Sequence, residues 1–209
     1  MQAYKSKADL QSAVEWLAAR DDRLAHAYDK HGLPPLRKRA DGFDGLCRLL
    51  ISQQVSTAAA SAIQARFDAL LPDKSPAQLL AVPDEALAAC GVSRPKQRYL
   101  RGLARAIVED GLNLAALRRA EDDNVFDTLV ALTGIGPWTA DCYLLFCLGR
   151  PDRFPAGDLA LQQAYKMLYR RNTRPDAAEL AALAQVWQPH RAAAARLLWT
   201  YYNGELGSQ

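Results

Sequence analysis

The stretch LTGIGPWTAD at residues 132–141 constrains the fold of this chain more than any other part of the sequence. Gly134 and Gly136 permit a tight reversal, because glycine adopts backbone angles that other residues avoid. Pro137 suits the first position of a new helix, where the missing N–H has no cost. Residues 138–148 are almost wholly apolar, so the sequence predicts two helices joined by a glycine hairpin, with the second helix buried.

The start of the second helix is a potential anion site. Its first N–H groups have no partner inside the helix, and phosphate is the ligand that such groups commonly bind. The alternative is a dinucleotide-binding fingerprint, since Gly134 and Gly136 match its first half. That alternative fails because no strand precedes the glycines, Thr139 stands where a third small residue is needed, and no βαβ unit surrounds them.

The hairpin and four other stretches together resemble the helix-hairpin-helix (HhH-GPD) superfamily of DNA glycosylases, in particular the 3-methyladenine DNA glycosylase II branch. The stretches are PAGD ending at Asp158, FDGLCRLLISQQVSTAAA (43–60), GVSRPKQRYLRGLA (91–104) and WQPHRAAAARLLW (187–199). The resemblance covers roughly residues 43–202, and its motifs occur in the family's order and spacing.

An all-α fold is expected. Helix-capping signals recur along the chain, and no run of alternating apolar and polar residues indicates a strand. Apolar residues at helical spacing predict one amphipathic helix over about residues 8–30. The resemblance implies two helical lobes with a DNA-binding cleft between them, in a compact form without the N-terminal α/β domain of larger relatives. Residues 1–52 and 156–209 would form the terminal lobe, and 53–155 the central lobe with the helix-hairpin-helix at 122–148.

Composition fits a folded, cytoplasmic protein. Half of the 209 residues are hydrophobic, no apolar run is long enough for a membrane span, and the N-terminus lacks a signal-peptide core. The net charge of +3 is mild, but basic residues cluster at 37–39, 94–105 and 166–174. Such clusters are either solvated helix faces or part of a DNA-binding surface.

The four cysteines, Cys47, Cys90, Cys142 and Cys147, form no CxxC pair and have no nearby histidine, so zinc is not expected. Some relatives carry an iron–sulfur cluster on cysteines that follow the catalytic aspartate. No cysteine follows Asp158, so no such cluster is expected, and the cysteines are interpreted as buried residues.

Asp158 stands where the family keeps its catalytic aspartate. Cleavage of the bond between base and deoxyribose builds positive charge on the sugar, which a fixed carboxylate stabilises, and the same group can orient or deprotonate the attacking water. The structural alternative is that Asp158 caps the next helix, a favoured position for aspartate. The two roles are compatible, since capping would orient the carboxylate.

Two tryptophans are predicted to bind the base. Trp138 stands where relatives that also cut the DNA strand have a lysine that forms a Schiff base, so the resemblance implies hydrolysis by water without AP-lyase activity. Trp199 aligns with the family's base-stacking tryptophan, and an indole face favours a cationic alkylated purine. Packing in the core is the alternative for both, and Ala195, Trp199 and Tyr202 do form a helical stripe.

The resemblance also implies DNA contacts. Gln53 and Gln54 match the turn that carries the side chain filling the gap left by the extruded base, although relatives use an apolar residue at Gln54. Gly134, Gly136 and Thr139 would hold DNA through the hairpin. The main-chain carbonyls of Val130, Leu132 and Ile135 match a site for Na⁺ or K⁺, and no catalytic cofactor is expected.

The sequence therefore predicts a monomeric, monofunctional DNA glycosylase that flips alkylated purines, such as 3-methyladenine and 7-methylguanine, out of damaged double-stranded DNA. One alternative keeps the activity but changes the lesion to an ethenoadduct, a deaminated base or an oxidised base. Another is a non-catalytic helix-hairpin-helix module that only binds DNA.

Overall fold

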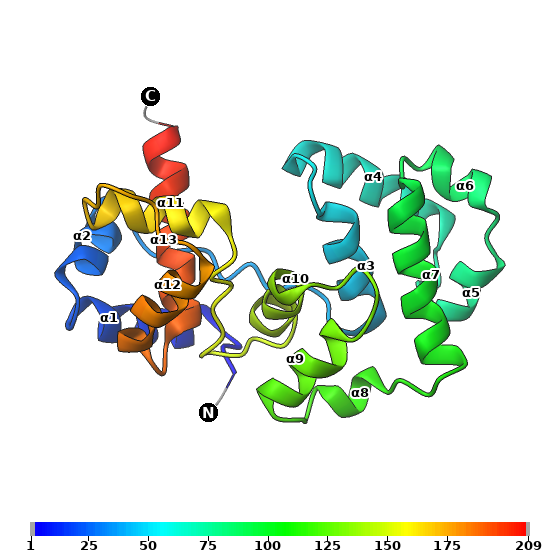
Figure 1. Cartoon of the computed structure of the whole chain (residues 1–209), viewed down its shortest axis with the longest axis horizontal. Helices are drawn as coiled ribbons and strands as arrows, with labels where there is room; N and C mark the ends of the chain where they lie inside the picture. The colour runs from blue at the N-terminus through cyan, green and yellow to red at the C-terminus, as the bar shows by residue number, and fades with distance from the viewer. Residues whose placement is uncertain (1–2, 208–209) are drawn as a thin grey trace. The chain divides into compact units, whose positions relative to one another are not determined.

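The computed structural model describes residues 3–207, and within this range the chain is all-α, as predicted, with no strand. The described residues form thirteen α-helices, a π-helical segment, Tyr143–Cys147, and a 3₁₀ segment, Ala184–Trp187. Figure 1 labels the α-helices along the chain. The α-helices are α1 (Lys7–Ala18), α2 (Asp22–His31), α3 (Gly42–Ser52), α4 (Thr57–Leu70), α5 (Pro76–Ala81), α6 (Asp84–Ala89), α7 (Arg94–Val108), α8 (Leu114–Leu117), α9 (Asp122–Val130), α10 (Pro137–Cys142), α11 (Leu159–Leu168), α12 (Ala177–Leu183) and α13 (Arg191–Leu206).

The chain divides into two compact units, one made from its two ends and one from its middle. Unit 1 comprises residues 1–38 and 144–209, and unit 2 comprises 39–143. Both boundaries lie earlier than the expected ones at 52 and 155. Helix α3 belongs to unit 2 because it packs against α4, α7 and α10. A DNA-binding cleft between the lobes stays a prediction.

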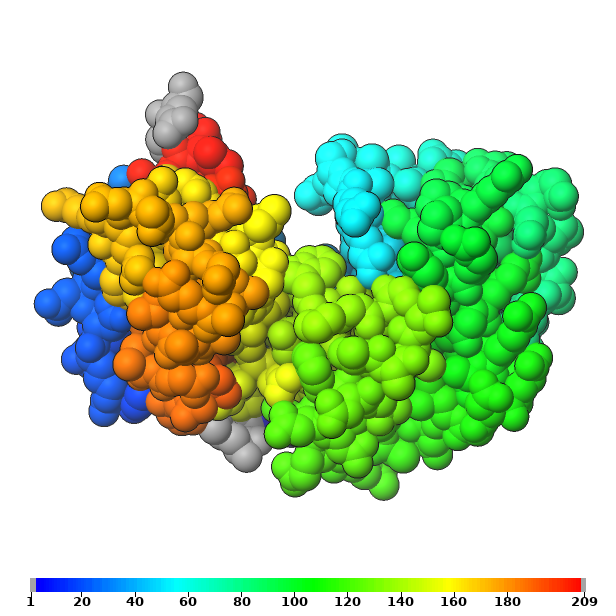
Figure 2. Space-filling view, in the orientation of Figure 1, coloured from blue at the N-terminus to red at the C-terminus, as the bar shows by residue number. Residues whose placement is uncertain are grey.

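Unit 1 is held together by contacts between segments far apart in sequence. Helix α13 packs against α1, α2 and α11, and four consecutive alanines, 192–195, let these helices approach closely because they are fully buried and small. In Figure 2 the N-terminal helices of unit 1, in blue, lie beside its C-terminal segments, in yellow and orange. The backbone N–H of Tyr4 donates to the carbonyl of Gly149 at 2.8 Å, which fixes the N-terminal segment.

The first helical region differs from expectation. A single helix was predicted over 8–30, but α1 ends at Ala18 and α2 begins at Asp22. Asp21 causes the break, because its carboxylate caps α2 by accepting from the N–H groups of Arg23 and Leu24. The same carboxylate accepts from the indole of Trp187 at 2.9 Å, so a tertiary contact stabilises the break.

Unit 2 is built around α3 and α7, which pack together and bury Leu46, Leu50, Leu100 and Leu103. The hairpin helices α9 and α10 pack on each other, and α10 also contacts α3. The hairpin is therefore supported by helix α3.

No helix among the described residues is long and apolar enough to cross a membrane. All four cysteines are buried, as the sequence indicated, and no disulfide joins any two of them.

Candidate active site and nucleic-acid interface

The glycine hairpin has the predicted form, but its two glycines differ. Helix α9 ends at Val130, and α10 begins with Pro137 at its first position. Gly134 has a φ of +91°, and a Cβ atom there would lie 2.2 Å from Cγ of Tyr99. Gly136 has a φ of −89°, open to any residue, and nothing lies within 4 Å of its would-be Cβ. The reversal and the close packing therefore depend on Gly134.

Gln53 connects the turn after α3 to this hairpin. Its side-chain Nε2 donates to the carbonyl of Gly134 at 3.0 Å and to Oγ1 of Thr139 at 2.9 Å. The side chain of Thr139 is only 2% exposed. Gln53 and Thr139, both predicted to contact DNA, thus brace the hairpin from inside with their side chains.

Gln54 is exposed and has a φ of +53°, in the left-handed region that non-glycine residues seldom occupy. The next residue, Val55, is an exposed apolar side chain with 38% of its surface accessible. The turn predicted to enter DNA thus presents one amide and one apolar side chain at the surface.

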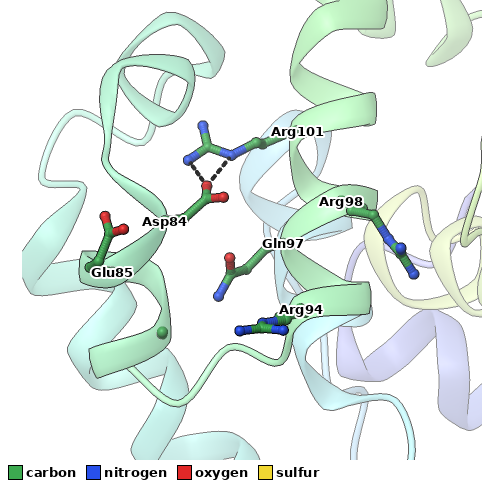
Figure 3. A pocket seen from close by; sticks show the side chains of 7 residues that line it. Asp84, Glu85, Arg94, Gln97, Arg98 and Arg101 are labelled. Atoms are coloured by element: carbon green, nitrogen blue, oxygen red, sulfur yellow. Dashed lines mark hydrogen bonds and ion pairs between the residues drawn. The ribbon is translucent and has the colours of Figure 1, made fainter.

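The basic cluster on α7 does not act as one charged face. Arg101 is bound to Asp84 and donates to the carbonyl of Val82 at 2.6 Å, so it joins α7 to the segment before α6. Arg94 and Arg98 are exposed, and Arg98 points away from Asp84 (Figure 3). These side chains line a surface cavity of about 500 Å³. Only part of the predicted basic surface is available to a partner.

Asp158 and Trp199, predicted separately as catalytic and base-binding residues, are brought into contact in unit 1. Asp158 is the N-cap of α11, and its Oδ1 accepts from the backbone N–H of Leu161 at 3.0 Å. The same oxygen accepts from Nε1 of Trp199, on α13, at 3.1 Å. Two donors from two helices therefore fix the carboxylate, and the predicted capping role is confirmed.

Phe146 and Arg196 complete this site and were not anticipated. The ring of Phe146 stacks on Trp199 with a centroid separation of 5.4 Å and an angle of 25° between the planes. The guanidinium carbon of Arg196 lies 4.8 Å from the centroid of Phe146, and Arg196 donates to the carbonyl of Leu145 at 3.1 Å. Arg196 is 3% exposed, and its isolated charge within the apolar run AAAARLLW was a sequence signal for a buried polar contact.

Phe146 owes its position to the π-helical segment Tyr143–Cys147, which follows α10 directly. A π-helix has a wider repeat than an α-helix and often occurs at functional sites. It shifts the direction in which successive side chains point, which helical periodicity in the sequence does not reveal.

The remaining predicted residues lie in unit 2. Trp138 is half-buried on α10, and Cys142, one turn later, is buried. Val130, Leu132 and Ile135 surround the hairpin turn, where the carbonyl of Leu132 accepts from the N–H of Ile135 at 3.0 Å. Within residues 3–207, no group of three or more histidine, cysteine or carboxylate side chains could hold a metal ion.

The fold and this site define an all-α protein of the helix-hairpin-helix class, and comparison with known proteins identifies its family. The profile of the HhH-GPD superfamily base excision DNA repair proteins matches residues 47–189. The chain therefore belongs to the HhH-GPD superfamily.

Individual proteins that are similar to this chain are named as DNA glycosylases or glycosidases. The structure is similar to the 3-methyladenine DNA glycosylase of Schizosaccharomyces pombe in complex with abasic DNA, with a TM-score of 0.83, 27% identity, and coverage of 90% of this chain and 95% of that one. It is also similar to the DNA-3-methyladenine glycosidase of Bacillus halodurans, with a TM-score of 0.78, 32% identity, and coverage of 99% and 94%. YfjP of Bacillus subtilis, provisionally named a DNA-3-methyladenine glycosylase, is 27% identical over 84% of this chain, which spans 64% of that protein's length.

Proposed function

We propose that this protein is a monofunctional DNA glycosylase that removes alkylated purines from double-stranded DNA. The observation that carries the proposal is the Asp158 carboxylate, which is held by two N–H donors and lies beside Trp199 in a chain of the HhH-GPD superfamily. The relatives named for 3-methyladenine support the substrate class.

Asp158 would act on the deoxyribose. As the bond between C1′ and the base nitrogen breaks, positive charge develops on the sugar, and the carboxylate stabilises it. At about 4 Å and an effective dielectric constant of about 20, this attraction amounts to roughly 4 kcal/mol, or about three powers of ten in rate. Water then adds to C1′, and the carboxylate accepts a proton from it.

Trp199 would bind the extruded base. Phe146 stacks on Trp199 and the Asp158 contact fixes the orientation of the indole ring. Alkylation at N3 or N7 makes a purine cationic, and an indole face attracts a cation by roughly 0.5–2 kcal/mol. Cationic purines are also good leaving groups, so they need little acid catalysis.

The hairpin would hold the DNA backbone, with Gly134 and Gly136 allowing a phosphate to approach the main chain. Carbonyl oxygens near the C-terminal end of α9, those of Val130, Leu132 and Ile135, are hard donors at the negative end of a helix dipole. This donor set suits Na⁺ or K⁺, whose positive charge would favour the same phosphate. Gln54 would enter the duplex when the base leaves it.

The direct test is a comparison of wild type with Asp158→Asn on DNA treated with a methylating agent. Wild type is expected to release 3-methyladenine and 7-methylguanine, and the variant to lose at least about two powers of ten in rate, because the amide carries no charge. Equal release by both proteins would contradict the role of Asp158. A panel of duplexes with single ethenoadenine, hypoxanthine or 8-oxoguanine lesions would show whether another base is the preferred substrate.

A further inference from the structure

The turn between α3 and α4 holds an unfavourable backbone conformation. Gln54 adopts a φ of +53°, which costs a residue with a side chain of order 1 kcal/mol or more. Gln54 and Val55 are exposed, so their own side chains do not supply the packing that would hold this conformation. The restraint must come from the residues on either side of them.

Lys96, on α7, supplies one restraint. Its Nζ donates to the carbonyl of Ile51 at 2.6 Å and to the carbonyl of Gln53 at 2.8 Å. Carbonyls at the end of a helix lack helical partners and carry the negative end of its dipole, so an ammonium group there is stabilising. Partial burial of the amine lowers the pKa of Lys96 below its ordinary value, which is consistent with its position against these two carbonyls.

The hairpin supplies the other restraint. The Gln53 side chain donates to Gly134 and Thr139, so the residue before Gln54 is held by its carbonyl and by its amide at once. Helix α7 reaches the hairpin as well, because the ring of Tyr99 occupies the space beside Gly134. Helix α7 therefore contacts both the turn after α3, through Lys96, and the hairpin, through Tyr99.

We propose that Lys96 is a positioning residue for base extrusion: by holding the carbonyls of Ile51 and Gln53, it fixes Gln54 and Val55 in the conformation that fills the gap in the duplex. This inference rests on the proposed glycosylase function. It gives Lys96 a role distinct from that of the exposed arginines of the same cluster, since its ammonium group is directed into the protein rather than toward a phosphate.

Loss of the Lys96 hydrogen bonds should slow base extrusion more than the other steps of the reaction. Extruding a correctly paired base requires the gap to be filled, whereas a mismatched base leaves the duplex at lower cost. Lys96→Met retains the length of the side chain but removes its donors. Excision of a paired lesion should slow about tenfold, the equivalent of about 1.4 kcal/mol, and excision of a mismatched lesion by no more than about threefold.

The experiment measures single-turnover excision of 7-methylguanine, or of whichever lesion of the panel wild type removes, opposite its normal partner and opposite a mismatched base. Lys96→Arg keeps donors at the same place and is expected to retain most of the wild-type rate on both duplexes. Lys7→Met is the matched control, because Lys7 is an exposed lysine of unit 1. Thermal melting by circular dichroism checks folding, and Lys96→Leu, which also has no donor, replaces Lys96→Met if the latter is unfolded at the assay temperature.

A second measurement follows base extrusion in a variant in which cleavage of the glycosidic bond is expected to be slow. In the Asp158→Asn background, 2-aminopurine placed beside the lesion reports unstacking by its fluorescence. Adding Lys96→Met should reduce the fluorescence increase on binding, while Lys7→Met should not.

The results of these experiments distinguish the positioning role of Lys96 from the proposed glycosylase function. Paired-lesion rates for Lys96→Met within twofold of wild type, or equal slowing on paired and mismatched lesions, would overturn the positioning role while leaving the glycosylase function intact. Equal loss in Lys96→Arg and Lys96→Met would also overturn it, because packing rather than donation would then matter. A wild type that excises no lesion of the panel would overturn the proposed function, and this inference with it.

Discussion

The indole Nε1 of Trp199 lies 3.1 Å from Oδ1 of Asp158, so the residue proposed to stack on the base also holds the carboxylate proposed to act on the sugar. The backbone N–H of Leu161 donates to the same oxygen at 3.0 Å. Because one donor comes from α13 and the other from α11, packing between these helices sets the direction of the carboxylate.

Trp199→Phe separates these two roles. Phenylalanine keeps an aromatic face against Phe146 but has no N–H, and a hydrogen bond to a charged group contributes about 1.5–3 kcal/mol. We expect single-turnover excision to slow by about tenfold or more while the affinity for DNA containing an abasic-site analogue changes little. Rates equal to wild type would show that the Trp199 hydrogen bond is not needed to orient Asp158.

Gly134→Ala should destabilise unit 2 strongly. The added methyl group would require movement of the Tyr99 ring, and the positive φ disfavours any L-residue with a side chain, so a loss of about 2 kcal/mol or more in the free energy of unfolding is expected. Gly136→Ala is the matched control, because its φ is negative and its surroundings are open. Urea denaturation of both variants gives the comparison, and equal losses would contradict it.

No covalent adduct with DNA is expected. The family resemblance predicts that Trp138 takes the place of the lysine of strand-cleaving relatives, and an indole cannot form a Schiff base with the sugar. Borohydride added during turnover should trap no protein–DNA complex, and the product strand should break only after treatment with alkali. A trapped complex would show that another amine attacks C1′ and that the protein is bifunctional.

Acid should weaken unit 1 through His190. Burial lowers the pKa of His190, with a smaller opposing effect from Asp152, and Nδ1 of its ring lies 2.8 Å from the hydroxyl of Tyr4. In the unfolded chain the pKa returns to about 6.5, so the unfolded state takes up this proton first as the pH falls. The stabilising contribution is therefore complete above about pH 6.5 and is lost as the pH falls toward the lower pKa of the folded state.

His190→Gln removes this titration. Between about pH 7.5 and about pH 5.5, the free energy of unfolding of wild type should fall more steeply than that of the variant, by at most about 1.4 kcal/mol per pH unit. Urea denaturation at several pH values measures both slopes. Parallel slopes would mean that His190 is protonated equally in the folded and unfolded states.

Much of the local structure could be predicted from the sequence. Ser56, Ser75 and Asp158 stand at helix starts, and each caps its helix through its own side chain. Pro137 begins α10 as expected. Such signals are readable because a cap acts on N–H groups only two or three residues away. The single helix expected over 8–30 was wrong because Asp21 is also held by Trp187, which is distant in sequence.

The sequence by itself determined the all-α class and the glycine hairpin, since these depend on residue type and short spacing, and the family resemblance made Asp158, Trp138 and Trp199 the candidate site residues. Only the tertiary structure decided that Trp199 bonds to Asp158, that Phe146 stacks on Trp199, and that Lys96 faces inward. The physical reason is that these contacts join helices far apart along the chain. Their geometry is set by how α7 packs on α3 in unit 2 and how α11 packs on α13 in unit 1, and by a π-helical segment that alters side-chain direction without a distinctive sequence pattern.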